Sequence, residues 1–256
     1  MSAPACKPTW GHSWGHTWVE LPVLRLPMPG VELIPCANGC YQIPIDITVP
    51  DDAAGRAVHR WFLGHQGAFL VWRFLLVSLD RLMRDPDSQL VRRAALGYDA
   101  YSVMLAYSGS CSREVYEAVI RPMMAKFDPA FSGRWARDYE PLPGLLRRVR
   151  TALGPAAAEP LSSASKANLL AHMEVMRKLV PDGQSLLRES GKTRVSTTDA
   201  ERARFDEFFL VSRENVCSSR YAAHRTAVMS AIDRDLAKHP LRPEYRDTLR
   251  TLVTHL

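Results

Sequence analysis

Two histidines lie on helical faces that are otherwise apolar, where an imidazole can bind a metal or transfer a proton. His65 falls within residues 61–79 and His224 within residues 205–232, where apolar residues recur at helical spacing. Imidazole is a common metal ligand and acid–base group, although a histidine on such a face is more often structural. Together with the segment described next, the two histidines indicate a buried metal cofactor beside a pocket for an aromatic, charged small molecule.

Residues 107–139 form a segment that is unusually polar and aromatic for its helical context. A free amino acid bound here would need a cation for its carboxylate, and a guanidinium group can make two parallel hydrogen bonds to one. Arg113 and Arg121 bracket the helix expected after Tyr107-Ser-Gly-Ser-Cys111, and Arg113 is the preferred candidate. The other candidate substrate contacts are Ser108, Ser110 and Tyr116 at the polar end, and Phe131 and Trp135 as an apolar wall.

These residues also have ordinary structural roles open to them. Serines before a helix often cap it. Arginines are usually surface residues, and aromatic side chains commonly pack beneath a loop.

The same residues resemble a known family. Tyr-Ser-Gly-Ser-Cys-Ser-Arg-Glu from Tyr107, Ile120-Arg-Pro and Ala130-Phe-Ser-Gly-Arg-Trp resemble histidine-ligated haem-dependent aromatic oxygenases of the tryptophan 2,3-dioxygenase superfamily. The bacterial haem-dependent tyrosine hydroxylases are the nearest group.

Two histidine motifs extend the resemblance over about residues 56–235. His65-Gln66 followed by Leu70 and Trp72 resembles the segment of the distal histidine, with Trp72 one position later than in the dioxygenases. His224-Arg225 resembles the proximal pair. The Gly/Thr-rich loop that follows the proximal helix in tryptophan dioxygenases has no counterpart here, which argues against ring cleavage.

The resemblance implies a haem enzyme with His224 as the proximal iron ligand. Some relatives attach haem through a cysteine four residues after a histidine, but Val228 occupies that position here, so haem b is expected to bind non-covalently. His65 on the distal side would hydrogen-bond the oxidant and shuttle a proton, or hold the ring of the substrate.

The reaction expected from the resemblance is hydroxylation of the ring of a free aromatic amino acid. L-tyrosine converted to L-DOPA in natural-product biosynthesis is preferred, with hydrogen peroxide, or dioxygen and a reductant, as oxidant. One alternative is an oxygenase of L-tryptophan or methyltryptophan that inserts one or two oxygen atoms. An alternative of another class is a non-catalytic helical protein whose basic surface binds an acidic partner.

Composition excludes several other classes. The 256 residues are 46% hydrophobic with a net charge of +6, which suits one globular domain. Basic residues are spread along the chain rather than clustered, so no nucleic-acid partner is expected. Five cysteines lack the spacing of a zinc site or a disulfide framework. No apolar run predicts a membrane span and no leader is evident, so a cytoplasmic location is expected.

The expected architecture is mainly α, with an extended arm over residues 1–50 and a helical haem-binding domain over 51–256. Helices are predicted at about 53–84, 88–105, 113–122, 144–153, 162–180, 198–238 and 243–256, with loops at 128–144 and 183–198. No alternating strand longer than four residues is expected.

The arm carries the repeat Trp10-Gly-His12-Ser-Trp14-Gly-His16-Thr-Trp18. Its two histidines could bind a metal, or its tryptophans could cover a pocket. Packing of the tryptophans on the body or on a second copy in a homo-oligomer is the preferred alternative.

Overall fold

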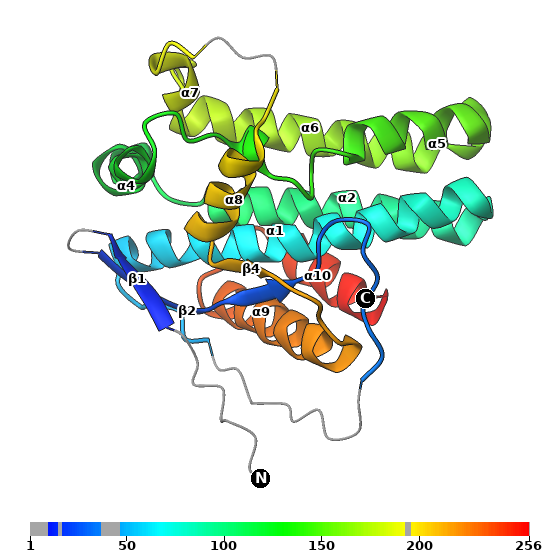
Figure 1. The fold of residues 1–256 in the computed structure, drawn as a ribbon, viewed down its shortest axis with the longest axis horizontal. Helices are drawn as coiled ribbons and strands as arrows, with labels where there is room; N and C mark the ends of the chain where they lie inside the picture. Colours follow the sequence, from blue (N-terminus) through cyan, green and yellow to red (C-terminus); the bar gives the residue numbers. More distant parts are fainter. Residues whose placement is uncertain (1–9, 15–16, 37–46, 193–195, 256) are drawn as a thin grey trace.

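The longest helix, α1 (Ala53–Arg84), lies at the centre of a mainly helical fold, as the sequence predicts (Figure 1). The computed structural model describes residues 10–14, 17–36, 47–192 and 196–255, and the side chains from residue 20 onward within these ranges. Asp52 caps α1 by accepting a hydrogen bond from the Gly55 amide, and the helix ends before Asp85-Pro86. Both predicted boundaries are confirmed.

Helix α1 is long and apolar enough to cross a membrane by length and composition alone. However, 78% of that apolar window is buried inside the protein. Its core residues pack against α2 (Ser88–Ser108), α5 (Leu142–Ala157) and α9 (Ser218–Lys238). The apolar character of α1 is therefore accounted for by packing within the domain.

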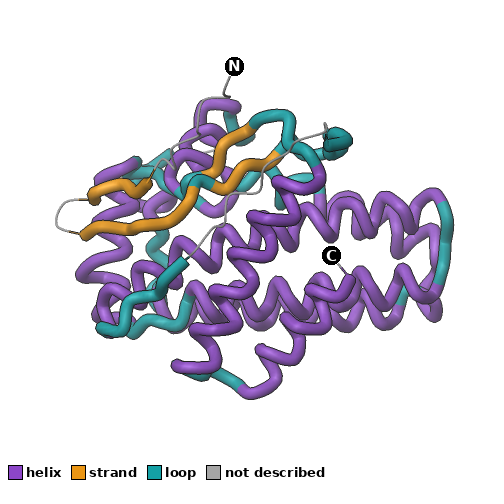
Figure 2. Tube along the Cα trace, turned by 90° about the horizontal axis from the view of Figure 1, so that it is seen from below, coloured by secondary structure: helices purple, strands orange, loops and turns teal. Residues whose placement is uncertain are grey.

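The helices lie in layers on either side of α1 and α2 (Figure 1). On one side α6 (Glu159–Leu179) packs along α2 and follows α5 after a kink at Gly154, whose φ is +76°. On the other side α9 is joined by α10 (Pro243–His255), which also contacts α2. The strands gather at one face of the helices (Figure 2).

Close approach of α1 and α2 depends on a glycine. A Cβ atom built on Gly64 would lie 2.8 Å from Ser108 Cβ and 3.1 Å from the Ser108 backbone nitrogen. The absence of a side chain at Gly64 therefore allows the end of α2 to approach the turn of α1 that carries His65.

The helix predicted to stop at Pro122 instead continues to Phe127. It consists of α3 (Arg113–Val115), a π-helical turn η1 (Tyr116–Ile120) and α4 (Arg121–Phe127). The change from π to α geometry places Pro122 in the first turn of α4, where its missing N–H needs no helical partner. The expected loops also contain two short helices, η2 (Gly133–Trp135) and α7 (Leu186–Glu189).

The single helix predicted over residues 198–238 is wrong. Helix α8 (Asp199–Phe208) begins with a Thr198–Glu201 capping box and ends at a turn in which Leu210 has a φ of +57°. A short strand, β4 (Val211–Arg213), follows before α9 begins. The break occurs because β4 pairs in parallel with β3 (Leu24–Leu26).

The N-terminal arm is more regular than expected. Strands β1 (Trp10–Trp14) and β2 (Thr17–Pro22) form an antiparallel hairpin, so the expectation of no strand longer than four residues is wrong. The metal, lid and oligomer hypotheses for the Trp-Gly-His repeat concern side chains outside the described part and stay predictions. Further along, Leu21, Leu24 and Leu26 are completely buried and belong to the same core as the helices.

Candidate functional site

His65 presents a neutral imidazole packed against two aromatic rings. Its ring stacks on Phe209 with centroids 3.9 Å apart and planes at 9°, and lies 4.7 Å from the Trp61 ring. Burial lowers the pKa of His65 to about 4, although the Trp61 carbonyl opposes this shift. Nδ1 lies 2.6 Å from that carbonyl oxygen, so Nδ1 carries the proton and donates. The Nε2 atom is consequently left with a lone pair that can accept a proton.

Phe209 is held over His65 by a neighbouring glutamine. The Gln66 amide nitrogen donates to the carbonyl oxygens of Pro22 (3.0 Å) and Phe209 (3.3 Å). These bonds connect α1 to the end of β2 and to the turn after α8. The positive φ of Leu210 completes that turn, and backbone strain of this kind often occurs at functional sites.

A larger aromatic cluster continues from this turn. Phe131 stacks on Phe205 at 5.7 Å, approaches Phe209 at 6.0 Å and meets the Trp135 ring edge-on at 5.5 Å. The indole nitrogens of Trp61 and Trp135 are buried and have no hydrogen-bond acceptor among the described residues. Buried donors of this kind are rare in native proteins, so the cluster retains hydrogen-bonding capacity that a bound group can use.

His224 lies on α9 and is 7% exposed. Burial lowers its pKa to about 4, and the positive charges of Arg25 and Arg220 add to that effect while Glu214 opposes it. No hydrogen bond joins either ring nitrogen to another described residue. His224 is thus a neutral imidazole with a free lone pair.

This donor chemistry fits haem iron better than a bare metal ion. Within the described ranges, no group of three or more His, Cys, Asp or Glu side chains could hold a metal ion. Haem iron needs only one axial ligand from the protein, because the macrocycle supplies the others. Arg25 and Arg220 beside His224 are cations of the kind that pair with haem propionates.

The structure brings some of the predicted substrate contacts to His65 and leaves others apart. Tyr116 lies 5.8 Å from Trp61, and Ser108 packs against Gly64 while donating to the Met104 carbonyl. Ser110 instead accepts a hydrogen bond from Arg60 at 3.3 Å.

The two predicted arginines face acidic residues of the chain itself. Arg113 is half exposed and lies 3.5 Å from Asp182. Arg121 lies 2.6 Å from Glu189 and donates to the Gln184 carbonyl. Both arginines therefore tie the start of the helical segment after residue 112 to the region around α7.

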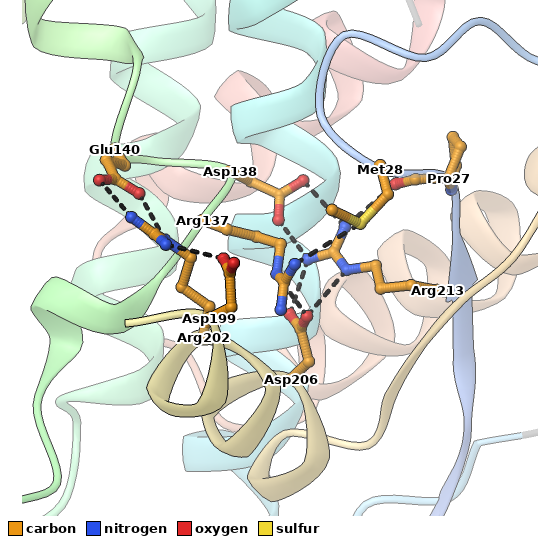
Figure 3. Close-up of polar contacts among 9 residues, drawn as sticks. All are labelled: Pro27, Met28, Arg137, Asp138, Glu140, Asp199, Arg202, Asp206 and Arg213. Atoms are coloured by element: carbon orange, nitrogen blue, oxygen red, sulfur yellow. Dashed lines mark hydrogen bonds and ion pairs between the residues drawn. The ribbon is translucent and has the colours of Figure 1, made fainter. Parts of the chain in front are cut away.

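A buried ionic network near the cluster was missed by the sequence reasoning (Figure 3). Arg213 on β4 donates to both Asp138 and Asp206, with the Asp206 oxygens 2.7 and 3.0 Å away. Arg137 Nε lies 2.8 Å from Asp206. Although burial disfavours the Arg213 charge, the bonds to Asp206 and the charge of Asp138 raise its pKa above the usual value. The seven-residue spacing of Asp206 and Arg213 was hidden within an expected helix.

A surface groove of about 460 Å³ adjoins this network. Leu210 lines it directly after Phe209, and Val23 lines it directly after Pro22. The groove therefore lies next to the two backbone segments that Gln66 holds beside His65. Its other lining residues are Met28, Arg137, Ala203, Asp206, Glu207, Val211, Ser212 and Arg213.

Comparison with known proteins decides the family. The model of the family described as SfmD 3-methyl-L-tyrosine peroxygenase matches residues 32–172, which is more than half of the chain. The chain belongs to this family. No curated protein matched the sequence in a direct search.

Family membership makes the protein an enzyme, as predicted, and rules out the non-catalytic binding protein. The SfmD family consists of haem-dependent aromatic oxygenases related to tyrosine hydroxylases. The matched range contains His65 and the segment from Tyr107 to Tyr139, whereas His224 lies beyond it.

Proposed function

We propose that this chain is a haem-dependent peroxygenase that hydroxylates the ring of a free tyrosine-type amino acid. The substrate named by the family, 3-methyl-L-tyrosine, is the first choice, and L-tyrosine converted to L-DOPA is the second. The observation that supports the proposal most directly is the neutral His65, packed against aromatic rings, in the part of the chain that matches the family.

The proposed cofactor is haem b, which His224 would hold through its iron. Bound haem iron supplies the activation of hydrogen peroxide. His224 suits the role because its imidazole is neutral and its nitrogens have no hydrogen-bond partner among the described residues. Val228 stands where a covalently attached haem would need cysteine, so attachment is non-covalent.

His65 is proposed to accept and return a proton during turnover. Because its Nδ1 donates to the Trp61 carbonyl, Nε2 is the atom that accepts the proton of peroxide or of the substrate phenol. With a pKa of about 4, the ring stays neutral at physiological pH, so the lone pair of Nε2 is available. The Phe209 ring covers one face of the imidazole, and the Trp61 ring packs beside it.

The first test is reconstitution of the purified protein with haem, followed by turnover. We expect a Soret band, and one oxygen atom added to 3-methyl-L-tyrosine or L-tyrosine when hydrogen peroxide is present. L-tryptophan should give no product, and dioxygen with a reductant should support less product than peroxide. Product from L-tryptophan alone would reject the tyrosine assignment.

Substitution of the two histidines separates their roles. His224→Ala should lose the Soret band, whereas His65→Ala should keep it and lose about 10²–10⁴-fold in turnover, the usual contribution of an acid–base group. His172→Ala, which removes an exposed histidine on α6, is the matched control and should retain both. Full haem retention and activity in His224→Ala would refute the ligand assignment.

A further inference from the structure

The groove beside the ionic network contains two opposite charges that the network leaves available. Arg137 lines the groove with its side chain 12% exposed. Its Nε faces Asp206, but the only described acceptor near Nη1 is the Met28 sulfur at 3.5 Å. Sulfur is a weak hydrogen-bond acceptor, so the outer edge of this guanidinium can still bind a carboxylate.

Glu207 supplies the negative charge. It lines the same groove and is exposed, and its side chain forms no hydrogen bond or ion pair with another residue of the described part. Its neighbour Asp206 is 4% exposed and fully used by Arg213 and Arg137. The carboxylate of Glu207 is therefore the one in this groove that can receive an ammonium group.

The network holds Arg137 in place before any ligand binds. In Figure 3 the carboxylates of Asp138 and Asp206 lie on either side of the Arg137 and Arg213 guanidinium groups. Because the ion pair between Arg137 Nε and Asp206 restricts the side chain, less side-chain freedom is lost when the other edge of Arg137 binds an anion.

We propose that this groove binds the α-carboxylate of the amino-acid substrate through Arg137 and its α-ammonium group through Glu207. The inference rests on the proposed function and replaces Arg113 and Arg121 as carboxylate ligands. The apolar side chains of Val23 and Leu210 provide a surface for the aromatic ring. A volume of about 460 Å³ leaves room for a single amino acid.

The position of the groove connects it to the proposed reaction site. Leu210 lines the groove and directly follows Phe209, whose ring covers His65, so adjacent residues of one turn contact the groove and the imidazole. An amino acid held by its zwitterionic end in the groove is thereby placed next to the Phe209 turn, with its ring toward the aromatic cluster.

The test is the affinity for L-tyrosine, measured by calorimetry without peroxide, so that turnover is not required. The variants are Arg137→Met and Glu207→Gln, and the matched control is Arg134→Met, an exposed arginine three residues away. Each groove variant should weaken L-tyrosine binding about 10- to 100-fold, as expected for a lost hydrogen bond between charged groups. The control should bind within twofold of the wild-type protein.

Ligand analogues provide a second measurement that does not depend on the folding of a variant. L-tyrosinamide lacks the carboxylate and 3-(4-hydroxyphenyl)propionate lacks the ammonium group, so each should bind the wild-type protein about tenfold or more weakly. Arg137→Met should no longer distinguish L-tyrosine from its amide. Glu207→Gln changes only an exposed side chain and should fold normally.

The outcomes separate this inference from the proposed function. If the haem-loaded enzyme hydroxylates its substrate while both groove variants keep wild-type affinity and KM, the groove assignment is wrong and the function stands. If L-tyrosine binds with the expected dependence on Arg137 and Glu207 but no product forms, the function fails and the binding site stands. Absence of amino-acid binding to the wild-type protein overturns the groove assignment.

Discussion

Replacing Arg213 with methionine tests whether the buried ionic network is held together by this residue. Arg213→Met keeps most of the side-chain volume but removes the group that donates to both Asp138 and Asp206. Asp206 retains Arg137 at 2.8 Å. Asp138 is 2% exposed and loses its side-chain hydrogen-bond donor, so in the variant it must fold either as an unpaired buried anion or with a proton taken up.

The cost of protonating Asp138 sets the expected loss of stability. Burial already raises the pKa of Asp138, and Arg213 opposes that shift, so removing Arg213 raises the pKa further. Protonating a carboxyl group whose ordinary pKa is about 3.9 costs about 1.4 kcal/mol for each pH unit above that value. Because the raised pKa of Asp138 means that the wild type already carries part of this cost, the free energy of unfolding should drop by up to about 4 kcal/mol at pH 7 and up to about 1.5 kcal/mol at pH 5. The first value agrees with the roughly 3–5 kcal/mol typical of a broken buried ion pair.

Urea denaturation followed by tryptophan fluorescence measures this difference between about pH 5 and pH 7.5. The control is the double variant Arg213→Met/Asp138→Asn, which removes the carboxylate as well. It should recover part of the lost stability and show no extra dependence on pH. The reasoning is refuted if Arg213→Met lies within about 1 kcal/mol of wild type at pH 7, or if its deficit does not change with pH.

Two further perturbations follow from the same structure. Burial lowers the pKa of His59, His65 and His224 to about 4, so below about pH 6.5 the unfolded chain binds more protons than the folded protein. The free energy of unfolding should therefore fall as the pH drops from about 6.5 toward 4, by up to about 1.4 kcal/mol per pH unit for each histidine. A urea-denaturation midpoint that does not change over this pH range would contradict this prediction. Gly64→Ala should lower the free energy of unfolding, measured by urea denaturation, by about 1–3 kcal/mol because its Cβ meets the α2 backbone, despite the ~1 kcal/mol that alanine gains over glycine in a helix. Gly144→Ala is the control and should be neutral or stabilising, because a Cβ has space there. Equal effects of the two substitutions would refute the close-approach argument.

The sequence was most informative where local signals determine the structure. Asp52 and Pro86 define the ends of α1 without help from distant residues. Helical periodicity also placed His65 near the inward side, and the structure adds its stacking partner, Phe209.

The division between α8 and α9 could not be predicted in this way. Residues 205–211 are mainly apolar and contain no glycine or proline, so their local preference is compatible with a continuing helix. Pairing of β4 with β3 and the bonds from Arg213 to Asp138 override that preference, and both partners are far away in the sequence.

The groove was missed for the same reason. Arg113 and Arg121 were preferred because they flank a recognisable motif, yet their charges are used by Asp182 and Glu189. Arg137 and Glu207 come from separate segments and meet in one groove only in the folded chain.

Parallel pairing of β3 with β4 also determines the order in which the chain can complete its fold. Arg25 and Glu214, which are joined beside this pair of strands, are 189 positions apart. At about 5–20 residues per second, a ribosome takes roughly 10–40 s to make the intervening chain. During that interval the apolar residues Leu21, Leu24 and Leu26 lack their final packing, although α1 and α2 can already associate. The N-terminal segment is therefore the part of the nascent protein that a chaperone would need to protect longest.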